Sequence, residues 1–183
     1  MRLVLDTCVL FPTAMRGLLL GAARAGSFVP LWSDRILGEW VRAAAKHGPT
    51  GTMQAEGEIA LLRANWPGAL IAPAPGLEAR LWLPDPADLH VLAVAVTGSA
   101  DGIVTVNAKD FPRNILAEEG LLRIDPDALL LDAFGQYPDE MRQAARAVLD
   151  EANRLSGRSW EMRALMKKAR LPRFGKALTG PGA

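Results

Sequence analysis

Three acidic residues stand where a fold could bring distant side chains together. Asp6 follows the apolar run at residues 3–5, Asp88 opens an apolar segment, and Asp110 comes soon after the apolar run at residues 102–106. Carboxylates gathered in one place repel one another unless a cation lies among them, and oxygen-only ligands favour Mg²⁺ or Mn²⁺. Such a site can activate water for the hydrolysis of a phosphodiester.

Each acid also has an ordinary structural interpretation. Helix capping accounts for Asp85 and Asp88, a turn after a strand for Asp6, the cap of a short helix for Asp110, and an Asx turn for Asp101. Any one of these interpretations is sufficient for a single residue. The joint placement of the acids is what favours a functional site.

Glu39 is the acid that periodicity supports least. It falls on the polar side of a predicted helix that Ser33 caps and that runs to about Lys46. Arg42 and Lys46 lie beside it on the helix surface, so periodicity alone predicts a solvated ion pair.

The elements that must position these acids alternate between strand and helix. The sequence predicts strands at residues 3–5, 28–32, 69–72, 102–106 and 121–124, and helices at residues 13–25, 33–46, 52–65 and 89–96. This alternation predicts an α/β domain with a mainly parallel sheet. In such sheets the carboxyl ends of the strands meet at one edge, where ligands bind.

From residue 126 onward the pattern is only helical, with candidates at residues 127–134, 139–155 and 159–170. The charge changes as well: residues 1–138 carry a net charge of −4, and residues 139–183 carry +5. We therefore predict a domain over residues 1–125 and a helical C-terminal extension over residues 126–183. The basic extension is either a cluster of cations for phosphate or a solvated helical tail.

Four short segments together resemble the PIN-domain nucleases, and within them the VapC-type ribonuclease toxins of type II toxin–antitoxin systems. The segments are Leu-Val-Leu-Asp-Thr at 3–7, Ser33 with Glu39 six residues later, Asp-Pro-Ala-Asp at 85–88, and residues 100–111, of which Thr-Val-Asn-Ala-Lys-Asp-Phe at 105–111 is the most specific. The resemblance covers about residues 1–125. It implies a three-layer α/β/α fold, and the extension resembles the helical segment of some larger toxins of this type.

The resemblance also implies a site and partners. Asp6, Glu39, Asp88 and Asp110 would form the catalytic metal site for Mg²⁺ or Mn²⁺, and Thr7 and Asn107 would help to hold metal or substrate. Asp85 and Asp101 are further acids in the region that could support the site or replace Asp88. The implied substrate is RNA, the implied partner is a small antitoxin, and the implied assembly is a homodimer. We expect basic residues of the extension to contact RNA phosphates, namely Arg154, Arg158, Arg163, Lys167, Lys168 and Arg170, with Arg173 and Lys176 beyond them.

Other functions remain open at this point. The chain could be a PIN nuclease of RNA processing or DNA repair, or a PIN module that binds RNA without cutting it. A phosphate-handling enzyme with Asp6 as nucleophile is disfavoured, because Cys8 stands where a second acid is usual. The single cysteine excludes an intramolecular disulfide framework, and no apolar run is long enough to span a membrane, so we expect a cytoplasmic protein.

Overall fold

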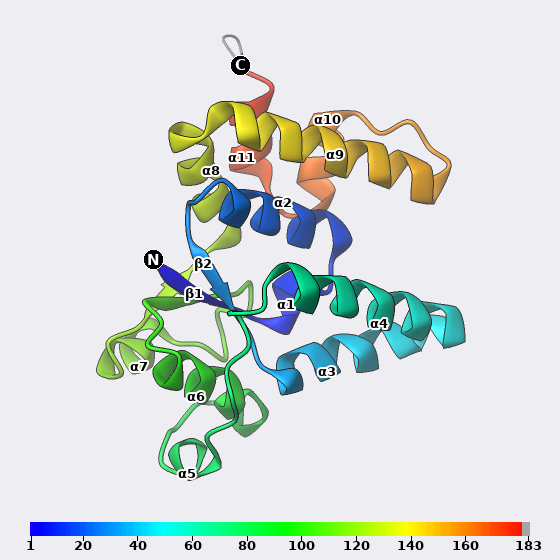
Figure 1. The fold of residues 1–183 in the computed structure, drawn as a ribbon. Coiled ribbons are helices and arrows are strands. Elements are labelled where there is room, and N and C mark those ends of the chain that lie inside the picture. The colour runs from blue at the N-terminus through cyan, green and yellow to red at the C-terminus, as the bar shows by residue number, and fades with distance from the viewer. Residues whose placement is uncertain (181–183) are drawn as a thin grey trace. The chain divides into compact units, whose positions relative to one another are not determined.

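The computed structural model describes residues 1–180, which divide into two compact units (Figure 1). The first unit is Met1–Phe11 with Val29–Arg123, and the second is Pro12–Phe28 with the chain from Ile124 onward. A search of the described residues finds no helix with the length and apolar character needed to cross a membrane.

The first unit is built on a parallel sheet with the strand order β2-β1-β3-β4. The strands are β1 (Arg2–Leu5), β2 (Val29–Leu31), β3 (Gly102–Val104) and β4 (Leu122–Ile124). The central strand β1 pairs with both neighbours, so that Val4 lies opposite Leu31 on one side and Ile103 on the other. These side chains are fully buried, which makes β1 the centre of the core.

Helices flank this sheet. They are α1 (Thr7–Leu10), α3 (Asp34–Ala44), α4 (Gly48–Asn65), α5 (Pro75–Glu78), α6 (Leu89–Thr97) and α7 (Arg113–Glu118), with the 3-10 turns η1 (Ala45–His47) and η2 (Pro86–Asp88). Helix α6 packs against β1 and β3, and α3 packs against α1 and α4. Residues 90–95 of α6 are all buried, as a sequence that is apolar except for His90 predicts.

Several predicted elements differ from the observed ones. The strand expected at residues 69–72 reduces to one bridge between Trp32 and Leu70, because the segment that it pairs with turns into α3 at Ser33, directly after Trp32. The strand expected at residues 102–106 ends at Val104. Helices α1 and α5 were not predicted, since four residues are too few to show a helical period.

The second unit consists of helices, namely α2 (Thr13–Arg24), α8 (Pro126–Gln136), α9 (Pro138–Ser156), α10 (Met162–Lys168) and α11 (Pro172–Leu178). Helix α2 lies very close to α9, because glycines take the contact positions. A Cβ atom on Gly21 would lie 2.6 Å from Ala144 Cβ, and one on Gly17 would lie 2.7 Å from Val148 Cγ2. Larger residues at these two glycines would force the helices apart.

One buried carboxylate joins the two ends of the C-terminal region. Asp127, only 5% exposed, accepts hydrogen bonds from the backbone N–H groups of Arg173 and Phe174, each at 2.9 Å. These are N–H groups of the first turn of α11, which have no partner within the helix. Asp127 therefore caps α11 from a distance of more than forty residues along the chain, and Phe174 is fully buried beside it.

The predicted α/β fold with a parallel sheet and a helical C-terminal region is confirmed. The division into domains at residue 125 stays a prediction. The packing adds one fact that periodicity did not indicate, namely that residues 12–28 belong to the same compact unit as the C-terminal helices. The reason is the close packing of α2 on α9.

Candidate active site

Asp6 lies immediately after β1 and is 6% exposed. Its Oδ2 accepts a hydrogen bond from Thr105 Oγ1 at 2.7 Å and another from Cys8 Sγ at 2.9 Å. Thr105 directly follows β3, so residues from the ends of two neighbouring strands fix this carboxylate. Burial and the neighbouring Asp6 charge raise the pKa of the Cys8 thiol to about 12, which keeps the thiol protonated and able to donate.

Glu39 is held by two other elements. Ser33 caps α3 by accepting from Ile36 N, and the buried face of α3 then turns Glu39 toward α1 and α6. Glu39 Oε2 accepts from Thr7 Oγ1 at 2.9 Å, and Oε1 lies 2.8 Å from Nε2 of His90.

Arg42 is the more distant partner of Glu39, at 3.6 Å and on the exposed side. Burial opposes ionisation of Glu39, but the hydrogen bonds from His90 and Thr7 outweigh it and hold the pKa of Glu39 below its usual value. The expectation of a solvated ion pair is therefore incomplete, because Glu39 also has two partners on the inner side.

Asp85 and Asp88 lie on one tight turn. Asp85 Oδ1 accepts from Ala87 N at 2.9 Å, so Asp85 caps η2 as the sequence predicts, with Pro86 at the first helical position. Asp88 then stands at the entry to α6. The Arg35 side chain donates to Ala87 O at 3.3 Å and fixes the turn from α3.

Asp110 comes from the loop after β3. Asn107 organises this loop, because its Oδ1 accepts from Asp110 N at 3.4 Å and its Nδ2 donates to Asp88 Oδ2 at 3.3 Å. Arg123 of β4 donates to Ala108 O and Phe111 O and closes the other side of the loop. Asn107 thus connects the two loops that carry Asp88 and Asp110.

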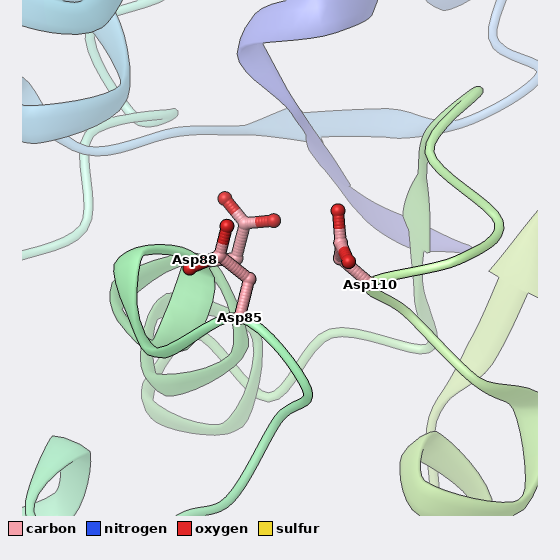
Figure 2. A group of neighbouring side chains, drawn as sticks. All are labelled: Asp85, Asp88 and Asp110. Atoms are coloured by element: carbon pink, nitrogen blue, oxygen red, sulfur yellow. The ribbon is translucent and has the colours of Figure 1, made fainter.

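Asp85, Asp88 and Asp110 form a cluster in which one carboxylate oxygen of each residue lies within 4.8 Å of the others. Figure 2 shows Asp85 and Asp88 on the same turn, with Asp110 facing them from a separate loop. Burial, followed by negative charge, raises the pKa of Asp88 to about 6. The acids that supply this charge are Asp6, Asp85, Asp110 and Glu39.

The donor set of this cluster fits a hard divalent cation. All ligand atoms are carboxylate oxygens, and burial together with the charges of the surrounding acids raises the pKa of Asp88. A cation such as Mg²⁺ or Mn²⁺ would remove that repulsion.

Apart from Asp101, the predicted residues of the acidic site fall into three groups. Asp88 and Asp110 lie in the cluster together with Asp85. Asp6 and Glu39 lie outside the cluster, but close enough for their charges to raise the pKa of Asp88. Thr7 and Asn107 bind acids of the site directly, as described above.

Asp101 lies elsewhere. It precedes β3, and its Oδ2 accepts from Arg2 N at 2.7 Å, at the amino ends of the strands. Asp101 cannot replace Asp88 from the opposite end of the sheet.

Three partners of the acids were not predicted from the sequence, namely His90, Thr105 and Cys8. A signal existed for His90, since it is the one polar side chain among the apolar residues at 89–96. A polar ring on a buried helix needs a partner, and its separation from Asp88 by two residues points to the site. Thr105 and Cys8 gave no such signal, because cysteine is often buried without a functional partner and threonine is common in and beside strands.

Comparison with known families decides the class of this fold. A family model described as "PIN domain" matches residues 2–109. The chain belongs to the PIN domain family. The PIN match includes Asp6, Glu39 and Asp88, and it ends one residue before Asp110.

One curated relative of this PIN domain is the protein named "Putative ribonuclease VapC50" from Mycobacterium tuberculosis (strain ATCC 25618 / H37Rv). The two are 36% identical over 63 residues, which is 34% of this chain and 37% of the relative. The similarity thus spans little more than a third of the length of the relative. No solved structure matches the chain.

Proposed function

We propose that this PIN-domain protein is a Mg²⁺- or Mn²⁺-dependent endoribonuclease and the toxin of a type II toxin–antitoxin pair. Membership of the PIN family supports a nuclease, and the similarity to a relative whose name includes ribonuclease supports RNA as the substrate. The metal site that we propose consists of Asp6, Glu39, Asp88 and Asp110.

The observation that carries the proposal is the environment of Asp88. Its pKa near 6 follows from burial and from four neighbouring carboxylates. Without a bound cation, this arrangement lowers the stability of the folded protein at neutral pH. Acidic side chains kept together at such a cost favour a cation-dependent activity over a purely structural role.

The chemistry that a bound divalent cation supplies is activation of water and neutralisation of charge on the phosphodiester. The side chains of this chain hold the acids ready for it. Thr105 fixes Asp6, Thr7 fixes Glu39, and Asn107 fixes Asp88. A site oriented in advance does not have to reorganise when RNA binds, and this lowers the barrier to hydrolysis.

The basic C-terminal helices are proposed to bind the RNA backbone. Residues 154–176 contain eight Lys or Arg and a single acid, Glu161. Arg154 is partly engaged, since it pairs with Glu151 at 2.6 Å, and Lys168 lies over the ring of Trp160. The cations that we propose as phosphate contacts are Arg154, Arg158, Arg163, Lys167, Lys168 and Arg170.

The toxin assignment also implies a small antitoxin, a homodimer and a cytoplasmic location. Where a short reading frame adjoins the gene, co-expression with its product tests this assignment directly. A toxin should slow growth alone and lose this effect when the small protein is present. Growth that is unaffected by the active protein would favour a role in RNA processing.

Cleavage of a structured RNA by the purified protein tests the nuclease assignment. We expect cleavage with Mg²⁺ or Mn²⁺ and none after chelation with EDTA. Asp88→Asn and Asp110→Asn should each abolish it, and Asp101→Asn should not, because Asp101 binds the Arg2 backbone instead. RNA binding without cleavage under all metal conditions would favour the non-catalytic alternative.

The same assay tests whether Asp6 or Asp85 is needed for cleavage together with Asp88. Both are near Asp88, but only Asp85 lies in the tight cluster of oxygens. If Asp85 serves only as the cap of η2, Asp85→Asn should retain cleavage, while Asp6→Asn should lose it. Loss in Asp85→Asn and retention in Asp6→Asn would move the metal site toward the cluster of Asp85, Asp88 and Asp110.

A further inference from the structure

His90 is a buried histidine whose only side-chain hydrogen bond within the described residues joins it to the proposed metal site. It is 4% exposed and lies in the first turn of α6, two residues after Asp88. Its Nε2 is 2.8 Å from Glu39 Oε1. Because the carboxylate of Glu39 can only accept, the ring donates through Nε2–H.

The other ring nitrogen has no such partner. His90 Nδ1 is buried and finds no hydrogen-bond partner among residues 1–180. The next residues of α6, Val91, Leu92 and Ala93, are buried and apolar, so an apolar side chain would suit this position better on packing grounds. Keeping a half-satisfied polar ring here indicates that the bond to Glu39 has a use.

That bond completes the orientation of Glu39. Thr7 engages Oε2 and His90 engages Oε1, so the two donors fix the plane of the carboxylate from opposite sides. His90 and Asp88 are on the same short segment, and the bond therefore also fixes the distance between α3 and the turn that carries Asp88.

We propose that His90 is a positioning residue that orients the Glu39 carboxylate and thereby raises the affinity of the acidic site for a divalent cation. The proposal rests on the function proposed above, since it takes Glu39 as a ligand of that cation. Partners of this kind, one step behind the ligands, typically contribute about tenfold or more in metal affinity.

Three substitutions separate orientation from packing. His90→Gln places its amide nitrogen four bonds from Cα, the same number as Nε2 of histidine, so it can donate to Oε1. His90→Asn keeps a polar amide but ends one bond short. His90→Leu fills the space and donates nothing.

The experiment measures Mn²⁺ binding to the metal-free protein by calorimetry, without RNA. We expect Mn²⁺ affinity to fall about tenfold in His90→Leu and His90→Asn, and to stay within about threefold of the parent in His90→Gln. In a Glu39→Gln background, His90→Leu should cause no further loss, because the carboxylate that it orients is gone. Circular dichroism checks that each variant is folded, and His90→Asn replaces His90→Leu if the latter is not.

The outcomes keep the two proposals apart. A parent that binds Mn²⁺ and cleaves RNA, with His90→Leu or His90→Asn binding Mn²⁺ equally well, overturns the role of His90 and leaves the nuclease intact. Equal losses in the Gln and Leu variants mean that packing of the ring is what matters, which also overturns it. A parent that binds no Mn²⁺ and cleaves no RNA refutes the proposed function and the role of His90 with it.

Discussion

Replacing Asp88 by Asn should stabilise the metal-free protein at neutral pH. The pKa of Asp88 is about 6 in the folded protein, owing to burial and the surrounding acids, against about 3.9 for an ordinary Asp. The folded state therefore binds the proton more tightly than the unfolded chain does. The free energy of unfolding that this tighter proton binding contributes is fully present below about pH 4 and is lost as the pH rises through about 6.

The size of this effect follows from the two pKa values. Their difference corresponds to about 3 kcal/mol, and because Asp88 is only partly buried, solvent screening reduces this to about 1 kcal/mol. Asn is neutral at every pH and retains an oxygen that can accept the hydrogen bond from Asn107. Asp88→Asn should thus be about 1 kcal/mol more stable than the parent at pH 7.5 and nearly equal to it at pH 4.

Urea unfolding in EDTA, followed by circular dichroism at pH 4, 5.5 and 7.5, measures this difference. A control is Asp34→Asn, which removes an exposed carboxylate paired with Arg63 and should change stability by less than about 0.5 kcal/mol at any of these pH values. Addition of Mn²⁺ at pH 7.5 should stabilise the parent and have much less effect on Asp88→Asn. A variant no more stable than the parent at pH 7.5 would refute the idea that repulsion is stored at this site.

Three further predictions concern the second unit. Asp127→Ala should lower the free energy of unfolding by about 1–3 kcal/mol in urea titrations, because two N–H groups of α11 lose their acceptor. Gly21→Val should cost more than about 2 kcal/mol in the same assay, since its side chain would collide with Ala144. The control Gly57→Val, where nothing lies within 4 Å, should leave stability unchanged or raise it slightly, because valine has a higher helix propensity than glycine. Neutralising four cations should weaken RNA binding and flatten its dependence on salt in filter-binding titrations, and an unchanged salt slope would assign the helices to packing instead. The four are Arg163, Lys167, Lys168 and Arg170.

Much of the fold could be predicted from periodicity and helix boundaries. The strand before Asp6, the cap at Ser33 and the Asp85-Pro86 helix start all have local causes, and all three are observed. The failures depend on distant neighbours. The expected strand at residues 69–72 has the right apolar residues, but the segment that it pairs with turns into α3 directly after Trp32.

The sequence could indicate that several acids lie near one another, but not which side chains bind them. Asp6 and Asp110 follow strands, so topology alone places them at one edge. Glu39 could not be placed by periodicity, because the exposed Arg42 explains it equally well and His90 and Thr7 are far away in sequence. Side-chain contacts between distant segments depend on tertiary packing, and no single-residue pattern encodes them.

The pairing of α2 with α9 has a consequence for synthesis of the chain. Residues 12–28 leave the ribosome early, yet the helix that covers them ends at Ser156, more than a hundred residues later. The apolar face of α2, including Leu18 and Leu19, has to wait for most of the chain to be made. In a protein shortened at residue 125, α9 would be missing and could not cover this face. The C-terminal helices are therefore needed for residues 12–28 to fold as well as for the extension itself.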